Sequence, residues 1–435
     1  MWWEIPKHLE VRNDTLFIAG KSTIELAQEY GTPLYVINAD RIRANYQRLY
    51  SAVTKHLSKD RNFDINYAMK AHSGLAVLET LKEVGSHVDA TSSFEVLTAE
   101  YVGFPKEKIL YTGTSVKPED MRITLGKAKM NIDSIGQIDR YAKLKDEEKF
   151  NPRVSIRINP GKGAGHVPEC ITAGKDAKYG VPEYQTIKAY KMAIDHGLEP
   201  VGIHCHIGSG ILPPDIGTYY SAAETLLDLA GEVSKKLNIE FEFVDIGGGI
   251  GIPYKETDKP INMDIFGKKV AEIVESKADE HSLDNFTLKM EPGRYIVGNS
   301  EILLMAVVDV SDKYMLELGV DGGFNVFDRP ARYNAYHEIV IANKADEEPK
   351  KDYRVSGNLC ESGDVFTESK KTSRKLPFAE ENDLIAILHV GAYGLSMASN
   401  YNMRGIPMEI MVDGGEQRIT RERDTWEDLV FKQNF

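Results

Sequence analysis

The chain has 435 residues, more than one typical domain holds, so two domains are expected. Hydrophobic residues make up 42% and charged residues 27%, as in an ordinary soluble globular protein. The formal net charge of −13 argues against a protein that binds nucleic acid, which needs a basic surface.

Cysteine content and hydropathy exclude further classes. The three cysteines, Cys170, Cys205 and Cys360, include no pair with CxxC spacing, so neither a zinc site nor a disulfide framework is indicated. The first residues, MWWEIPKHLEVRND, contain no apolar signal segment, and no apolar run of 18 residues occurs. We therefore expect a cytoplasmic protein without a membrane span.

The first predicted elements are a hairpin and a helix. Residues 8–20, HLEVRNDTLFIAG, alternate in polarity around an Asn-Asp turn, which predicts two strands. We expect this hairpin to pair with strands from the end of the chain. Residues 39–57 read as an amphipathic helix that completes the outer ring of a barrel.

From residue 65 to residue 294, short apolar strands alternate with amphipathic helical stretches. The eight predicted strands are INYAMK, SHVDAT, KILYTG, MNIDS, RVSIRIN, VGIHCHIG, FEFVDIGGG and LKMEPG. Strands that alternate with helices pair in parallel, and eight of them favour a (β/α)8 TIM barrel over an open sheet. We predict an α/β fold whose barrel spans residues 36–300.

Beyond the barrel, strands follow one another with little helix between them. The candidates are EILLMAVVDVSDKYM, FNVFD, EIVIANKA, YRVSG, DLIAILHV and MEIMVDGG. This pattern predicts a mostly antiparallel β domain of residues 1–35 and 301–435. The charged runs at 343–352 and 418–428 are expected to be solvated loops or helix faces.

Barrel enzymes bind their substrates at the carboxyl ends of the strands, so the residues there are the first candidates. The first strand ends at Lys70, the second carries Asp89, and the fifth ends at Asn159. The last three strands end in HCHIGSG, DIGGGIG and EPGR. We expect these residues to converge on one face of the barrel.

Each of these motifs has more than one interpretation. Gly247, Gly248 and Gly249 suit either a phosphate cradle or a plain flexible turn. His204 and His206 could bind a metal, be ordinary buried histidines, or, for His206, lie flat against a ring-shaped ligand. Glu291 could pair with Arg294 or with a protonated ring nitrogen. A lysine, a phosphate cradle, an aromatic plate and a ring-nitrogen carboxylate together are what pyridoxal 5'-phosphate requires.

Specific stretches along nearly the whole chain carry a resemblance to a known family. They are YAMKAHSG, VDATSSFE, HCHIGSG, DIGGGIGIPY, EPGRYIV, RPARYNAYH, LCESGDVF and GAYGLSMASNYN. With them the chain resembles the fold-type III pyridoxal-phosphate decarboxylases, an alanine racemase-like barrel family, and among these the diaminopimelate decarboxylases. The resemblance implies decarboxylation of meso-2,6-diaminopimelate to L-lysine and carbon dioxide, the last step of lysine biosynthesis.

The resemblance also implies the cofactor site. Lys70 matches the Schiff-base lysine, His206 the ring-stacking histidine and Glu291 the partner of the ring nitrogen. The other implied contacts are Asp89 at the ring and, at or near the phosphate, Ser209, Gly247, Gly248, Gly249, Gly293, Arg294 and Tyr393.

Substrate contacts follow from the same resemblance. Cys360 matches a residue that reaches the site from the neighbouring subunit and supplies a proton, which implies a homodimer. Glu361 matches the contact to the distal ammonium. The residues implied at the distal carboxylate are Arg294, Arg329 and Tyr333, with Tyr393 also close to the substrate.

Some stretches depart from the family pattern and keep alternatives open. RPARY adds Arg332, YNMRGIPME has Ile406 in place of a second arginine, and 159–180 is a variant loop. Related decarboxylases act on carboxynorspermidine or siderophore precursors. A racemase on the same barrel would need a tyrosine base and usually an arginine where this chain has Glu291. A cofactor-carrying binding protein would not need CESGD or GAYG, and a metal-dependent hydrolase is the weakest alternative.

Overall fold

The computed structural model describes residues 1–150 and 152–434, and these form two compact units. The barrel unit comprises Ala44–Ile252 and Lys259–Ile296. The β unit comprises Met1–Arg43, Pro253–Asp258 and the chain from Val297 onwards. Among the helices described, none combines the length and apolar character needed to cross a bilayer.

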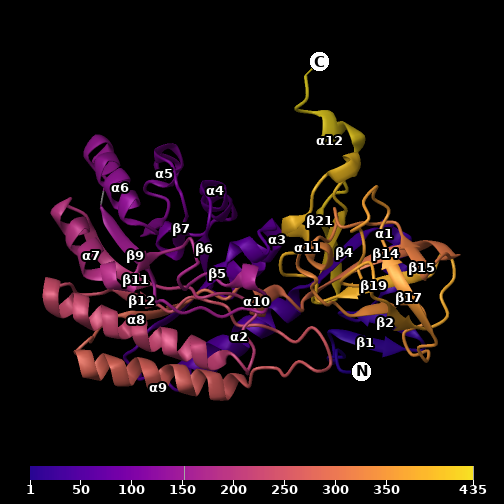
Figure 1. Ribbon diagram of the computed structural model, residues 1–435, viewed down its shortest axis with the longest axis horizontal. Helices are drawn as coiled ribbons and strands as arrows, with labels where there is room; N and C mark the ends of the chain where they lie inside the picture. Colours follow the sequence, from indigo (N-terminus) through magenta and orange to yellow (C-terminus); the bar gives the residue numbers. More distant parts are fainter. Residues whose placement is uncertain (151, 435) are drawn as a thin grey trace. The chain divides into compact units, whose positions relative to one another are not determined.

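Eight parallel strands close the barrel (Figure 1). They are β5 (Phe63–Ala68), β6 (His87–Ala90), β7 (Ile109–Thr112), β8 (Lys129–Ile132), β9 (Arg153–Asn159), β11 (Glu199–His204), β12 (Phe243–Asp245) and β13 (Thr287–Met290). Each strand pairs with the next, and β13 pairs with β5. A two-residue strand, β10 (Val181–Pro182), pairs with the end of β9. The predicted (β/α)8 barrel is confirmed, strand for strand.

Amphipathic helices alternate with these strands. They are α2 (Ala39–Thr54), α3 (Leu75–Glu83), α4 (Ser93–Val102), α5 (Pro118–Thr124), α6 (Ile135–Glu148), α7 (Thr186–Asp195), α8 (Ile216–Leu237), α9 (Met263–His281) and α10 (Arg294–Val297). Ser92, Ser134 and Asn262 fix where α4, α6 and α9 begin, because each side-chain oxygen accepts the backbone N–H three residues on.

The β unit contains a small and a large sheet. β1 (Leu9–Arg12), β2 (Thr15–Ile18) and β3 (Lys21–Ser22) form the small antiparallel sheet. The large sheet contains β4 (Leu34–Asn38), β14 (Glu301–Asp312), β15 (Leu316–Val320), β16 (Ile339–Ile341), β17 (Lys351–Ser356), β18 (Arg374–Leu376), β19 (Leu384–Leu388), β20 (Met408–Asp413) and β21 (Glu416–Arg421). Most of its pairs are antiparallel; β4–β20 and β15–β17 are parallel.

Short helices complete the chain. The α-helices of the β unit are α1 (Thr23–Tyr30), α11 (Arg329–Tyr333) and α12 (Trp426–Val430). Single turns of 3-10 helix occur in both units: η1 (Met69–Ala71), η2 (Lys106–Lys108), η3 (Pro168–Cys170), η4 (Glu183–Gln185), η5 (Leu395–Met397) and η6 (Tyr401–Met403).

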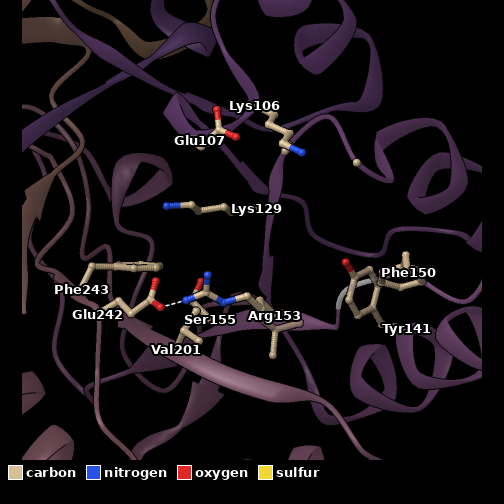
Figure 2. Close-up of a pocket in the computed structure, with 13 residues that line it drawn as sticks. Lys106, Glu107, Lys129, Tyr141, Phe150, Arg153, Ser155, Val201, Glu242 and Phe243 are labelled. Atoms are coloured by element: carbon tan, nitrogen blue, oxygen red, sulfur yellow. Dashed lines mark ion pairs between the residues drawn. The ribbon is translucent and has the colours of Figure 1, made fainter.

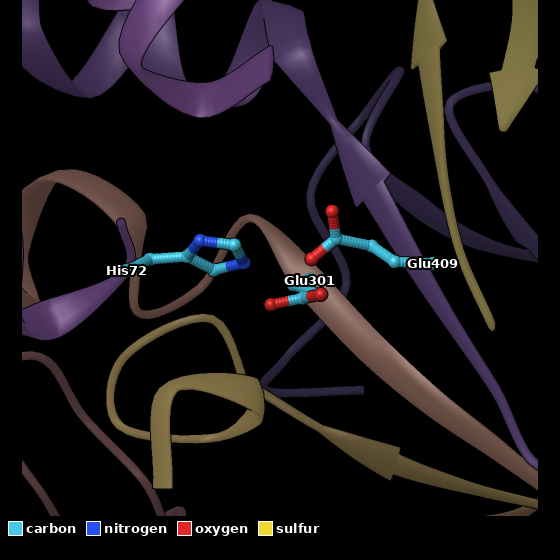
Figure 3. Close-up of side chains that lie close together, drawn as sticks. All are labelled: His72, Glu301 and Glu409. Carbon is cyan, nitrogen blue, oxygen red and sulfur yellow. The ribbon is translucent and has the colours of Figure 1, made fainter. Parts of the chain in front are cut away.

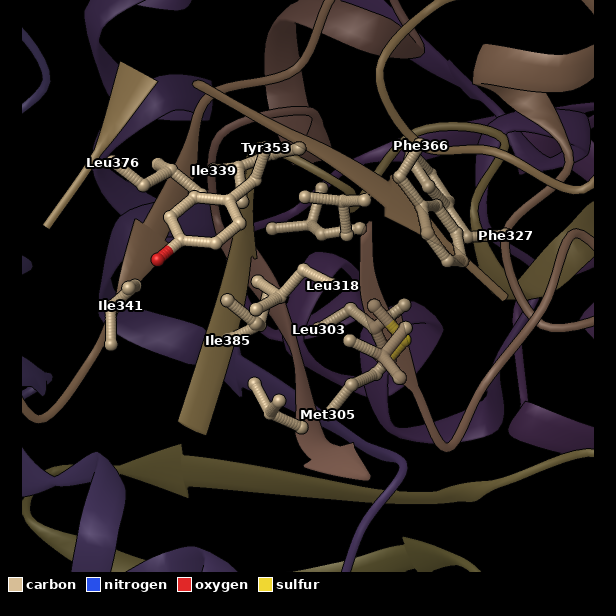
Figure 4. Packing of buried hydrophobic residues seen from close by; sticks show 14 of the residues in the cluster. Leu303, Met305, Leu318, Phe327, Ile339, Ile341, Tyr353, Phe366, Leu376 and Ile385 are labelled. Carbon is tan, nitrogen blue, oxygen red and sulfur yellow. The ribbon is translucent and has the colours of Figure 1, made fainter. Parts of the chain in front are cut away.

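The first half of strand β14 is buried on both faces. Leu303 and Met305 point into one apolar cluster, with Phe327 and Tyr353 among its members (Figure 4). The alternate residues of the strand belong to a second cluster, which also contains β4 and the small sheet. This double burial explains why the stretch ILLMAV, after Glu301, is continuously apolar instead of alternating.

Two buried carboxylates lie on the strands that flank β4. Glu301 begins β14 and Glu409 lies on β20 (Figure 3). Thr420 donates a hydrogen bond of 2.5 Å to Glu409. Burial first, and then the charges of these two carboxylates, raise the pKa of Tyr35 on β4 well above its usual value.

The structure corrects the predicted ends of the chain. The hairpin of residues 8–20 forms, and its strands belong to the small sheet. It reaches the later chain by backbone hydrogen bonds such as that from Leu16 to the carbonyl of Ala342, whereas β4 is the early strand that joins the C-terminal ones. The boundary predicted at residue 36 therefore falls inside a strand of the β unit. FNVFD is a turn, and 416–421 is a strand at the sheet edge, where only one neighbour is needed.

Candidate functional site

Lys70 lies just beyond the end of the first barrel strand. β5 ends at Ala68, and Lys70 follows in the single turn η1 with its side chain partly buried. Burial is the main cause of four pKa shifts here: it raises the pKa of Glu291 and Asp89 and lowers that of His204 and His206. The positive charge of Lys70 acts on all four groups as well. The lysine and these predicted partners therefore share one end of the barrel.

A buried imidazole and carboxyl meet at the ends of β11 and β13. Nε2 of His204 lies 2.9 Å from Oε2 of Glu291, and the two residues are 0% and 3% exposed. Burial lowers the pKa of His204 to about 3 and raises that of Glu291 to about 7. An imidazole with so low a pKa is neutral, and it donates this hydrogen bond when Glu291 is ionised.

Asp245 lies close to this pair, and the three residues together are close enough to be considered as metal ligands. Ligand atoms of His204, Asp245 and Glu291 lie within 4.8 Å of one another. Oδ1 of Asp245, however, accepts the N–H of Gly247 at 2.9 Å, and burial raises the pKa of Asp245 well above its usual value. His204, Asp245 and Glu291 are therefore placed to bind protons and to interact with one another.

Two buried carboxylate oxygens fit the ring of the implied cofactor. Oε1 of Glu291 and Oδ1 of Asp89 are buried and have no hydrogen-bond partner within the residues described. A buried acceptor left without a donor costs about 1–3 kcal/mol. A ligand that carries a protonated ring nitrogen supplies such a donor, so the chain suits pyridoxal 5'-phosphate here.

The glycine loop after β12 passes so close to its neighbours that side chains are excluded. A Cβ at Gly248 would lie 1.9 Å from the carbonyl oxygen of Glu291, and one at Gly247 would lie 2.2 Å from that of Cys205. The φ angles of Gly247 and Gly249, +71° and +112°, also favour glycine. The loop thus presents bare backbone, as a phosphate cradle requires.

His206 is held by this loop in one tautomer. Its Nδ1 accepts the N–H of Gly248 at 3.1 Å. Burial first, and then the charges of Lys70 and Arg157, hold the pKa of His206 well below its usual value. The ring is therefore neutral, with its proton on Nε2, and its role as a plate against the cofactor stays a prediction.

Ser209 and Arg294 meet in the structure as the resemblance implies. Nε of Arg294 donates to Oγ of Ser209 at 3.3 Å. Gly293 lets this turn approach η1, because a Cβ there would lie 3.0 Å from the Cβ of Ala71.

Sequence reasoning missed Arg157 and gave Asn159 no role. Nη2 of Arg157 donates to the carbonyl of His206 at 3.4 Å, and its charge lowers the pKa of Glu291. Asn159 binds both backbone groups of Gly174 and thereby anchors the 159–180 loop. Alternate polar residues inside the apolar strand RVSIRIN were the available signal, since one face of a barrel strand points inward.

The candidates of the β unit are described by themselves. Arg329 is 1% exposed; it donates to Nε2 of His337 at 3.1 Å and lies 5.5 Å from the ring centre of Tyr254. Tyr333 ends the same helix. The extra charge of Arg332 is neutralised by an exposed ion pair with Asp328.

The other three candidates of this unit lie on loops. Cys360 and Glu361 are exposed after β17. Tyr393 follows β19 and has a left-handed backbone, with φ of +60°. The implied roles of these three residues stay predictions.

A cavity at the opposite end of the barrel holds none of the predicted site residues. It measures about 220 Å³ and is lined by residues that begin strands, including Lys129, Arg153 and Phe243 (Figure 2). Arg153 is ion-paired with Glu242, and Lys129 lies over the ring of Phe243.

Comparisons with known proteins agree with this geometry. The family described as "Pyridoxal-dependent decarboxylase, pyridoxal binding domain" matches residues 41–298. The chain is 44% identical to the diaminopimelate decarboxylase of Methanothermobacter thermautotrophicus, over 96% of this chain and 95% of that one. It is 33% identical to the Bacillus subtilis diaminopimelate decarboxylase, over 95% and 94%.

Solved structures show the same likeness. A diaminopimelate decarboxylase from M. jannaschii in complex with L-lysine has a TM-score of 0.90 and 32% identity, with 98% of each chain covered. The diaminopimelate decarboxylase of Helicobacter pylori, also with L-lysine, has a TM-score of 0.84 and 31% identity, covering 94% of this chain and 98% of that one. This chain belongs to the pyridoxal-dependent decarboxylases, and among them to the diaminopimelate decarboxylase family.

Proposed function

We infer that the chain decarboxylates meso-2,6-diaminopimelate and releases L-lysine, the last step of lysine biosynthesis. The observation that carries this inference is the buried Glu291, which lies at the same end of the barrel as Lys70. Its Oε1 has no hydrogen-bond donor among the residues described. Pyridoxal 5'-phosphate, when bound, supplies an electron sink for the bond that breaks. A relative that crystallised with L-lysine supports the choice of substrate.

The barrel unit is proposed to hold the cofactor. Lys70 binds its aldehyde carbon, His206 lies against its ring, and Glu291 keeps the ring nitrogen protonated with Asp89 beside it. We propose that the phosphate is bound by Ser209, Gly247, Gly248, Gly249, Gly293 and Arg294 of this unit, and that Tyr393 of the β unit is a further contact. The neutral His204 then orients the Glu291 carboxylate by its 2.9 Å hydrogen bond.

Binding the far end of the substrate requires both signs of charge. We propose that Arg294, Arg329 and Tyr333 bind the distal carboxylate and that Glu361 binds the distal ammonium. Tyr393 contacts the substrate as well. Cys360 holds the proton that replaces the lost carboxylate.

Two wider proposals accompany this function. The protein is proposed to be a cytoplasmic homodimer, with Cys360 supplied by the neighbouring subunit. The family resemblance supports the dimer, and the three dispersed cysteines support a reducing compartment.

The test is carbon dioxide release by the purified holoenzyme from meso-diaminopimelate, ornithine, arginine and carboxynorspermidine. We expect release from meso-diaminopimelate and, in Lys70→Ala, loss of both activity and the visible band of lysine-bound cofactor. Release from carboxynorspermidine alone would overturn the substrate. An unchanged visible band in Lys70→Ala would overturn the assignment of Lys70, and the absence of a visible band in the wild type would overturn the cofactor.

A further inference from the structure

Three consecutive residues of the loop after β17 are each held by a different side chain, two of them from a segment more than forty residues away. The backbone N–H of Cys360 donates to Oδ1 of Asn402 at 2.7 Å. The carbonyl of Asn358 accepts from Nη2 of Arg404 at 3.0 Å. Between them, Leu359 donates its N–H to Oδ2 of Asp364 at 2.8 Å. We call residues 358–363 the Cys360 loop.

Asp364 is a local clamp of this loop. Its other carboxylate oxygen accepts the N–H of Phe324 at 2.6 Å, and its own N–H donates to the carbonyl of Glu361 at 3.1 Å. Asp364 alone fixes the middle of the loop but leaves the peptide of Cys360 without a bond. Asn402 supplies that bond from a segment that lies far along the chain.

The segment that carries Asn402 has an unusual backbone. Asn402 has φ +57° and ψ +26°, and Met403 has φ +56°, so two successive residues with a Cβ are left-handed. Such conformations cost free energy and persist only where the surroundings enforce them. Burial of Met403 does not offset this free-energy cost, because the residue is 53% exposed.

Contacts on both sides hold the segment in this shape. The ring of Tyr401 stacks on that of Phe324, with centroids 5.3 Å apart. Asn400 donates to the carbonyl of Arg404 at 3.1 Å. The two left-handed residues therefore lie between the Tyr401 stacking contact and the Asn400 hydrogen bond. Their conformation brings Asn402 within hydrogen-bond distance of Cys360.

We propose that Asn402 and Arg404 are positioning residues that fix the Cys360 loop and thereby aim its thiol. The proposal rests on the proposed role of Cys360 as the proton donor. It assigns a role to the sequence YNMR. It also explains why Arg404 is kept in this chain, although Ile406 replaces the second arginine of the family pattern.

Two substitutions separate the hydrogen bond from the backbone. Asn402→Gly removes the acceptor but adopts the left-handed conformation readily, whereas Asn402→Asp keeps an acceptor. We expect Asn402→Gly to lower kcat about tenfold, the scale of one hydrogen bond, with little change in KM. We expect Asn402→Asp to stay within about twofold of the wild type.

A matched control is available in the same unit. Asn382 is also exposed and left-handed, with φ of +71°, and only its backbone makes a hydrogen bond in the structure described. Asn382→Gly should keep the wild-type kcat. A wild-type kcat in Asn402→Gly, or equal losses in Asn402→Gly and Asn402→Asp, would overturn the proposal.

A double substitution distinguishes this proposal from the role of Cys360 itself. In a Cys360→Ala background, Asn402→Gly should lower kcat no further, and a second tenfold loss would show that Asn402 acts elsewhere. Alkylation of Cys360 by iodoacetamide, followed by peptide mass spectrometry of the holoenzyme, should be several-fold faster in Asn402→Gly and in Arg404→Gln. If Cys360→Ala kept full activity, the proton-donor role would fail, and unchanged alkylation would separately overturn the positioning.

Discussion

Among single residues, Glu291 is the one whose environment contributes most to the chemistry. Burial raises its pKa to about 7, and the charges of Lys70 and Arg157 oppose that effect. In the protein alone, the carboxyl is thus poised between its two protonation states near neutral pH. A cationic ring nitrogen beside it would favour the carboxylate, so cofactor binding and ionisation of Glu291 support each other.

This raised pKa predicts a dependence of stability on pH. Between pH 4.5, its ordinary pKa, and about 7, the folded chain keeps a proton that the unfolded chain has released. The stability contributed by Glu291 is therefore complete below 4.5 and is lost as the pH rises through 7, with a full extent of about 3 kcal/mol. Glu291→Gln cannot titrate and removes this contribution to the slope.

Urea unfolding of the cofactor-free wild type and Glu291→Gln at pH 5 and pH 8 measures the effect. We expect the free energy of unfolding of the wild type to fall, relative to that of the variant, as the pH rises from 5 to 8. Parallel behaviour of the two proteins would show that Glu291 is not buried as described.

At the scale of elements, the glycine loop is held between the ends of β11 and β13. The Cβ added by Gly248→Ala would meet the backbone carbonyl of Glu291, which cannot rotate away. We expect Gly248→Ala to lower stability by about 1–3 kcal/mol and to weaken retention of the cofactor. Thermal unfolding and the visible band of the holoenzyme measure the two effects.

Gly217 on α8 is the matched control, because a Cβ there meets nothing within 4 Å. Gly217→Ala should be neutral or stabilising by up to about 1 kcal/mol. If Gly248→Ala were equally harmless, the loop would have more room than the structure shows.

Elements also show what sequence reasoning can reach. The barrel was predictable because each strand is short, apolar and followed by a helix, so Lys70 and Glu291 could be placed at strand ends. FNVFD has the same apolar pattern as a strand, yet the N–H of Phe324 bonds to Asp364, forty residues away. The contact of Asn402 with Cys360 is equally non-local. No local pattern specifies such bonds.

For the whole molecule, the proposed homodimer makes a prediction that mixing of two variants can test. Lys70→Ala and Cys360→Ala should each be nearly inactive. If every site takes Lys70 from one subunit and Cys360 from the other, random reassortment restores one intact site per mixed dimer. We expect about one quarter of the wild-type activity after the two variants are unfolded and refolded together.

Refolding each variant alone is the control, and sedimentation of the mixture reports its oligomeric state. No recovery in a mixture that sediments as a dimer would mean that one subunit supplies both residues.

Strand β4 also has a consequence for synthesis of the chain. It is made before the barrel, but Ile37 pairs with Glu301 and Leu34 with Met408, both made after it. On the ribosome, the barrel strands can all pair while this fully buried strand still lacks both neighbours. The nascent chain must keep an apolar strand from pairing with other chains until β20 has emerged. A chain that stops before β20 would leave that strand with an open edge.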